Sequence, residues 1–229
     1  MRYYPIFLDL RGRRCIVVGG GRVAERKVQA LLRARASVHV ISPLVTPRLG
    51  LLAAHKKILL SPRAYRPGDL KVPRSERLEV TRRVRPALVF AATDSPNTQR
   101  AIRKDSEAIG VLVNTADDAR ESDFIVPASF AQGDLVVAIA TSGSSPALAR
   151  RLRRQLQVTL GREYRSYLRF LREARKQVRD TVPDKAKRAK IYRQLSKAPM
   201  PDRLPKGAPA RAAADLKKWL ANVTGTQRG

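Results

Sequence analysis

The fold of this chain is decided by one stretch near its start, Cys15-Ile16-Val17-Val18-Gly19-Gly20-Gly21-Arg22-Val23-Ala24-Glu25-Arg26-Lys27. A β-branched run stops at three glycines, and a helical pattern with apolar residues on one face begins directly afterwards. Gly19, Gly21 and Ala24 match the G-x-G-x-x-G/A pattern of a dinucleotide-binding turn. The first position allows a tight turn, the second lets backbone N–H groups approach a pyrophosphate, and the third lets the helix pack close to the strand. The stretch therefore predicts a dinucleotide site.

The composition is that of a globular chain. Its 229 residues can hold a Rossmann-type domain and a smaller second unit, and a hydrophobic fraction of 43% is sufficient for a core. A single cysteine excludes an internal disulfide, and with only two histidines no metal site is expected. The chain has neither a signal pattern nor an apolar run long enough to cross a membrane, which favours a soluble cytoplasmic protein without membrane partners.

Strands and helices alternate through the first half, which predicts an α/β fold with a doubly wound parallel sheet. We expect strands over 15–18, 38–41, 58–60, 87–91 and 111–114, and helices over 23–33, over 46–55 and from Pro96. Residues 62–86 are rich in proline, arginine and glycine, which favours a long loop or an insertion. His39 alternates with apolar neighbours, which is typical of a hydrogen-bonded strand histidine.

Ligand residues are expected where the strands end, because open α/β sheets bind ligands outside the carboxyl ends of their strands. The acidic residue that usually holds the ribose hydroxyls after the second strand is absent, and Ser42-Pro43-Leu44 stands there. Pro43 and Leu44 are candidate walls of an adenosine pocket, and the choice between NAD and NADP stays open. Thr93, at the end of another strand, is either a ligand contact or, like Asp94, a cap for the next helix.

The pattern changes after Asp123. Two strand-like runs, 124–130 and 135–141, are joined by Ala131-Gln132-Gly133-Asp134, which predicts a hairpin. Ser145 followed by Pro146 predicts the start of a helix. Further helices are expected over 163–179, 184–195 and 212–223.

Several motifs resemble those of one family in order and spacing. They are Pro5-Ile6-Phe7-Leu8, the glycine stretch, Ala91-Ala92-Thr93-Asp94, Val113-Asn114 with Asp117, Phe124-Ile125-Val126-Pro127-Ala128, and Ser144-Ser145-Pro146-Ala147-Leu148-Ala149-Arg150. The chain resembles the precorrin-2 dehydrogenase/sirohydrochlorin ferrochelatase family, the N-terminal module of siroheme synthase, closely over about residues 1–160. No methyltransferase domain follows, which implies the stand-alone form. Residues 71–86 are longer than the usual connection, and Ser142 replaces the first glycine of a glycine pair.

The resemblance implies a homodimer whose chain has three parts. These are a Rossmann NAD-binding domain over 1–123, a strand-and-helix dimerisation segment over 124–160, and an α-helical C-terminal domain over 161–229. The implied reaction is the NAD-dependent oxidation of precorrin-2 to sirohydrochlorin, which removes a hydride and a proton. Some members also insert Fe²⁺ into sirohydrochlorin, and the sequence leaves this ferrochelatase activity open.

The resemblance also assigns residues. Asp117 aligns with the catalytic aspartate, which suits a general base, although its position alone fits a loop or capping residue equally well. The implied nucleotide contacts are Gly19, Gly20, Gly21, Arg22, Val23, Pro43, Leu44 and Thr93. The implied substrate contacts are Asn114, Thr141 and Ser144.

The formal net charge of +28 has two interpretations. A positive field would steer a tetrapyrrole substrate with many carboxylates, but most of the charge is better explained by solvated arginine-rich helix faces. An alternative function is a nucleotide-sensing Rossmann protein that binds nucleic acid through its basic C-terminal helices, although no motif with interleaved aromatic residues supports it. A third hypothesis, a scaffold without activity, is disfavoured by Asp117 and the intact glycine loop.

Overall fold

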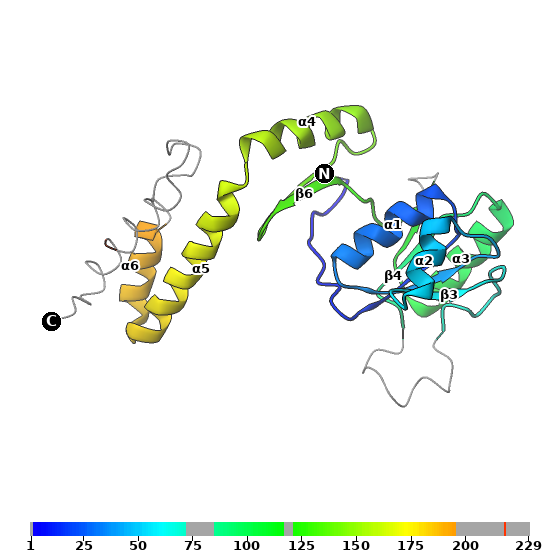
Figure 1. Cartoon of the computed structure of the whole chain (residues 1–229), viewed down its shortest axis with the longest axis horizontal. Coiled ribbons are helices and arrows are strands. Elements are labelled where there is room, and N and C mark those ends of the chain that lie inside the picture. Colours follow the sequence, from blue (N-terminus) through cyan, green and yellow to red (C-terminus); the bar gives the residue numbers. More distant parts are fainter. Residues whose placement is uncertain (1, 72–84, 117–120, 196–217, 219–229) are drawn as a thin grey trace. The chain divides into compact units, whose positions relative to one another are not determined.

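The computed structural model describes residues 2–71, 85–116, 121–195 and 218 (Figure 1). By its internal contacts the chain divides into two units, Met1–Val126 and Pro127–Gly229. The division into three parts at 123/124 and 160/161 stays a prediction. In the described ranges, no helix is long and apolar enough to cross a membrane.

The first unit is a five-stranded parallel sheet with connecting helices (Figure 1). Its strands are β1 (Arg14–Val18), β2 (Ser37–Ile41), β3 (Leu59–Ser61), β4 (Leu88–Ala91) and β5 (Val113–Thr115), in the order β3-β2-β1-β4-β5. The helices are α1 (Arg22–Arg33), α2 (Pro47–Ala54) and α3 (Pro96–Ile109). The strand order reverses between β1 and β4, which is where doubly wound sheets bind ligands. The predicted fold class is confirmed.

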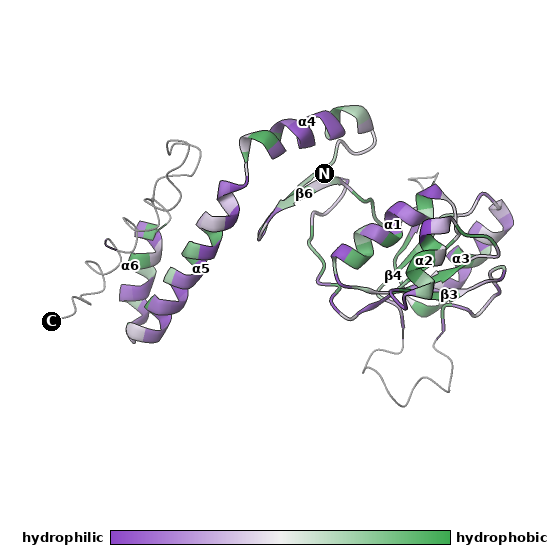
Figure 2. Cartoon of the chain, viewed as in Figure 1, coloured by the Kyte–Doolittle hydropathy of each residue, from purple (hydrophilic) through white to green (hydrophobic). Residues whose placement is uncertain are grey.

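The central strands β1 and β4 are buried on both faces of the sheet, which explains why they are apolar runs and not alternating ones. One face packs against α1 and α2, and the other packs against α3 and the loop that follows β3. Leu70 of that loop is 1% exposed, so the described part of the predicted 62–86 loop contributes to the core. Residues 72–84 of that loop lie outside the described residues. In Figure 2 the hydrophobic colour follows the strands of the sheet.

Two residues of the sheet behave as their sequence context predicts. Cys15 is fully buried, and burial raises the pKa of its thiol to about 11. The Nε2 atom of His39 lies 2.9 Å from Ser61 Oγ, and its Nδ1 atom lies 3.4 Å from a guanidinium nitrogen of Arg14. Burial and the charge of Arg14 lower the pKa of His39 to about 4, so this strand histidine is neutral.

The second unit begins with an antiparallel hairpin of β6 (Ala128–Gln132) and β7 (Leu135–Ile139). Three helices follow: α4 (Pro146–Thr159), α5 (Glu163–Thr181) and α6 (Lys185–Leu195). The predicted helices over 163–179 and 184–195 are thus confirmed within a residue or two. The predicted helix over 212–223 lies outside the described residues except for Lys218.

The hairpin strands are shorter than the sequence predicts at both outer ends. The prediction that a strand begins at residue 124 is wrong, because Pro127 has no N–H for the ladder and Phe124 gives its carbonyl to Asn114 of β5. The strand predicted over 135–141 ends at Ile139. It ends there because the chain turns through Ser142 and Gly143, whose φ angles are 52° and 91°.

Candidate functional site

The glycine loop connects β1 to α1 at the carboxyl edge of the sheet. Gly19 has a φ of 120°, and a Cβ added to it would lie 2.0 Å from the carbonyl oxygen of Ala92. A Cβ on Gly20 would lie 1.9 Å from the carbonyl oxygen of Leu44. A Cβ on Gly21 would meet no atom within 4 Å. Gly19 and Gly20 are therefore required by the fold, whereas Gly21 borders open space that a ligand could fill.

The N-terminus of α1 is left without a side-chain cap. Its N-cap residue is Gly21, which has no side chain that could accept a hydrogen bond from the first turn. By contrast α2, α3 and α4 are capped by Thr46, Ser95 and Ser145, whose side chains accept from Leu49, Thr98 and Leu148 respectively. The first-turn N–H groups of α1, at Arg22 and Val23, thus point from a positive helix end toward the space beside Gly21. Such an end fits the pyrophosphate of a dinucleotide.

The loop after β2 lies directly against the glycine loop. The backbone N–H of Thr46 donates to the carbonyl of Gly20 at 2.9 Å, and the Thr46 hydroxyl donates to Glu25 Oε2 at 2.7 Å. Pro43 is exposed, and Leu44 is 83% exposed although its backbone contacts Gly20. These exposed apolar side chains lie where the sequence predicts the adenosine pocket.

Thr93 lies just past the end of β4, where it is half-buried. Its carbonyl accepts from the Gln99 side chain at 2.6 Å, and its hydroxyl accepts from the backbone N–H of Ser95 at 3.4 Å. Ser95 is the N-cap of α3, so neither Thr93 nor Asp94 caps that helix. The structure brings Gly19–Val23, Pro43, Leu44 and Thr93 to the carboxyl ends of β1, β2 and β4, and their contact with a nucleotide stays a prediction.

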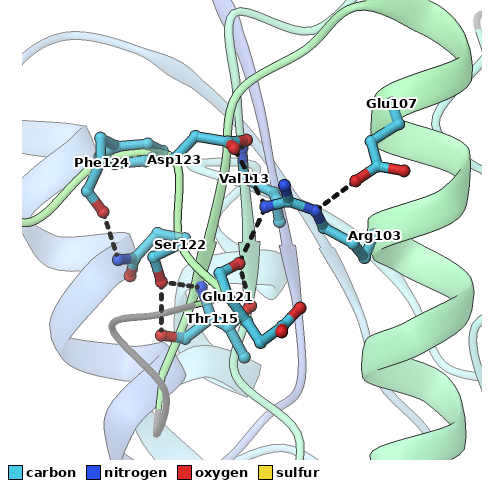
Figure 3. A network of polar contacts seen from close by, with 9 residues as sticks. Arg103, Glu107, Val113, Thr115, Glu121, Ser122, Asp123 and Phe124 are labelled. Carbon is cyan, nitrogen blue, oxygen red and sulfur yellow. Dashed lines mark hydrogen bonds and ion pairs between the residues drawn. The ribbon is translucent and has the colours of Figure 1, made fainter.

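The first and last residues of β5 are hydrogen-bonded to the segment that returns after residue 120 (Figure 3). The backbone N–H of Val113 donates to Asp123 Oδ2 at 2.8 Å, and that of Thr115 donates to Ser122 Oγ at 2.9 Å. Arg103 of α3 donates to Asp123 Oδ1 at 3.0 Å and to the carbonyl of Glu121 at 2.9 Å. Since β5 is an edge strand, this segment covers its open side.

Asn114 lies at the centre of β5 and is 7% exposed. Its Oδ1 accepts from Lys27 Nζ at 3.0 Å, and its Nδ2 donates to the carbonyl of Phe124 at 2.9 Å. Both ends of the amide are therefore engaged within the protein, and a contact with substrate stays a prediction. Lys27 belongs to the glycine stretch, and the sequence alone assigns no role to it. Its position three residues after the buried Ala24 was the signal that it faces the sheet.

Three predicted site residues are not among the described residues of the first unit. Thr141 and Ser144 belong to the second unit, in the turn that begins α4, where Thr141 Oγ1 accepts from the N–H of Ser145 at 3.1 Å. Asp117 lies outside the described residues. In the described part of the chain, no group of three or more His, Cys, Asp or Glu residues could hold a metal ion.

Comparison with protein families gives two matches. Residues 6–128, more than half of the chain, match a family model described as "Putative NAD(P)-binding". Residues 132–158 match the model "Sirohaem biosynthesis protein central". The chain belongs to the family of the siroheme synthase N-terminal module.

Full-length relatives agree with this family, and a solved structure agrees with the fold. A siroheme synthase of Chromobacterium violaceum is 37% identical over 96% of the chain, and one of Nitrosomonas europaea is 30% identical over 98%. The chain spans only 44% and 45% of the lengths of these two relatives. A solved structure titled "SirC, precorrin-2 dehydrogenase" is similar with a TM-score of 0.70 at 24% identity, and the match covers 94% of this chain and 100% of that one. At this identity the likeness establishes the fold.

Proposed function

We propose that this chain is an NAD-dependent precorrin-2 dehydrogenase, which oxidises precorrin-2 to sirohydrochlorin in siroheme biosynthesis. The observation that carries the proposal is the uncapped N-terminus of α1 beside Gly21, within a chain of the siroheme synthase family. A requirement for NAD favours the cytoplasm as the compartment.

NAD, when bound, would accept a hydride from precorrin-2, and a proton must leave the substrate as well. The chain's own residues would orient the nucleotide. The N–H groups at the start of α1 would hold the pyrophosphate, and Pro43 and Leu44 would line the adenosine. Thr93 would border the nicotinamide ring of the nucleotide, because it follows β4, next to the point where the strand order reverses.

Asp117 is proposed as the base that takes the proton. The family resemblance is the support for this role, together with its place in the sequence shortly after Thr115, the last residue of β5. Carboxyl ends of parallel strands are where α/β enzymes place reacting groups. An aspartate side chain can act as a general base that accepts such a proton.

The experiment is an anaerobic turnover assay with enzymatically generated precorrin-2. Wild type is given NAD or NADP, and sirohydrochlorin formation is followed by absorbance. Asp117→Ala is compared with Asp118→Ala, which removes the neighbouring carboxylate. The proposal expects oxidation that requires NAD, is lost in Asp117→Ala and survives in Asp118→Ala. Absence of oxidation with either nucleotide would overturn the proposed function, and equal loss in both variants would remove Asp117 from its role.

The same assay decides the ferrochelatase activity. After oxidation is complete, Fe²⁺ or Co²⁺ is added, and metal insertion is followed as a second spectral change. In this reaction the metal is a substrate that displaces two pyrrole protons, so it needs no resident metal site. If metal insertion is no faster with the protein than without it, the chain carries out only the dehydrogenase step.

We further propose that two copies of the chain associate through the second unit. The hairpin β6–β7 has only two strands, and such a hairpin is marginally stable unless something covers it. Val136 of β7 is 48% exposed, and Leu148 and Val158 of α4 are 45% and 84% exposed. Apolar exposure on both the hairpin and α4 favours a partner with the same surface, as in a symmetric dimer.

Light scattering after size-exclusion chromatography tests this association. Val136→Asp is expected to shift the protein from dimer to monomer. Leu51→Asp is the matched control, since Leu51 is an apolar residue of the first unit that is 61% exposed. A monomeric wild type would contradict the proposal, as would a Val136→Asp protein that stays dimeric.

A further inference from the structure

Lys27 is a cation on the buried side of the helix that begins at the glycine loop. It lies between the buried residues Ala24 and Val28 of α1, so its side chain is directed toward the sheet. Its ammonium nitrogen lies 3.0 Å from Asn114 Oδ1 and 5.3 Å from the centre of the Phe90 ring. Burial lowers the pKa of Lys27, and the charge of Arg26 adds to this effect.

The contacts of Lys27 continue through Asn114 to the segment after residue 120. The Asn114 amide nitrogen donates to the carbonyl of Phe124 at 2.9 Å. The ring of Phe124 meets that of Phe90 edge-to-face, with centroids 5.4 Å apart and an interplanar angle of 84°. One lysine from α1 is thereby joined to β4, to β5 and to the chain that covers the edge of β5.

Packing alone does not account for a lysine here. The described residues that contact its ammonium group are an amide and an aromatic ring, and neither is a carboxylate. A half-buried ammonium group loses hydration, and an apolar side chain would fill the same space without that loss. What the ammonium adds is a directed, charge-assisted hydrogen bond that fixes which way the Asn114 amide points.

We propose that Lys27 is a positioning residue. Through Asn114 and Phe124 it holds the end of β5 at a fixed position relative to the bound nucleotide. The proposal rests on the proposed function, because it assumes that α1 holds the pyrophosphate at its N-terminus. Lys27 lies within about two turns of that N-terminus, on the same rigid helix. Both the nucleotide and the end of β5 would then be fixed to one element, which sets the distance between the two reactants.

The test compares Lys27→Met and Lys27→Arg with Arg26→Met, which removes an exposed charge from the neighbouring position. Lys27→Met is expected to lower kcat for precorrin-2 oxidation at least about tenfold, while KM and the NADH dissociation constant change less than about threefold. Lys27→Arg is expected to restore most of kcat, because a guanidinium can still donate to the amide. Arg26→Met is expected to behave as wild type.

A second measurement does not depend on activity. Hydrogen exchange of the amides over 113–115 and 121–124 is expected to accelerate in Lys27→Met and to stay unchanged in Arg26→Met. Unchanged exchange in Lys27→Met would overturn the inference, as would a loss confined to KM, which would make Lys27 a substrate contact. A wild type that binds no NADH and oxidises no precorrin-2 would instead refute the proposed function, whatever the exchange pattern.

Discussion

Replacing Gly21 by alanine should separate nucleotide binding from stability. A Cβ at this position meets nothing within 4 Å, so the folded chain can accept it. Its cost is the poorer N-cap, about 0.5–1 kcal/mol, which lowers Tm by only about 1–4 °C in a chain of this size. The same Cβ occupies the space where backbone N–H groups would reach the pyrophosphate. Losing one such charge-assisted hydrogen bond costs about 1.5–3 kcal/mol, or roughly a 10- to 100-fold weaker affinity for NADH.

Gly19→Ala is the matched contrast, because its Cβ would lie 2.0 Å from the carbonyl oxygen of Ala92 and its φ is 120°. Backbone strain and overpacking together should cost at least about 3 kcal/mol. NADH affinity is measured by fluorescence titration and Tm by thermal melting. A Gly21→Ala protein that binds NADH like wild type would refute the placement of the pyrophosphate. One that melts as early as Gly19→Ala would refute the open space beside Gly21.

Three further predictions follow from particular residues. His39 has a folded pKa of about 4, below its ordinary value near 6.5, so the unfolded chain takes up a proton first as the pH falls. The free energy of unfolding should therefore decrease as the pH decreases from about 6.5 to 4. Urea denaturation of His39→Gln should show a smaller decrease over this range, and a decrease equal to that of wild type would contradict the lowered pKa of His39. Cys15, buried with a raised pKa, should not react with a thiol reagent at pH 8 until urea unfolds the chain, and rapid native labelling would disprove its burial. Ser142 has a φ of 52°, so Ser142→Gly should stabilise the protein by about 0.5–1 kcal/mol in the same denaturation assay, whereas a loss of stability would show that the turn is unstrained.

The sequence predicts those features that depend on local rules. The glycine loop, the alternation of strands and helices, and the Ser145-Pro146 helix start each follow from residues close together in the chain. The glycine that the resemblance leads one to expect at position 142, where this chain has serine, also has a local reason. The turn there has a left-handed φ, which glycine adopts more easily.

The features that the sequence does not predict depend on contacts between distant residues. Lys27 and Asn114 are 87 positions apart, and nothing near either residue indicates the other. The run from residue 124 has strand-like composition. However, the carbonyl of Phe124 accepts a hydrogen bond from the Asn114 side chain, and Pro127 has no N–H to donate to a β-ladder. Ser95 caps α3 in place of its neighbours Thr93 and Asp94, a difference of one or two residues that composition does not resolve.

The most direct test of the central claim is the stoichiometry of a single anaerobic turnover. Precorrin-2 and NAD are mixed with excess enzyme, and NADH and sirohydrochlorin are measured together. The account predicts that the two products appear in equal amounts and at the same rate, since the hydride that leaves the substrate is the one gained by the nucleotide. Sirohydrochlorin formed without NADH, or no sirohydrochlorin at all, would contradict it.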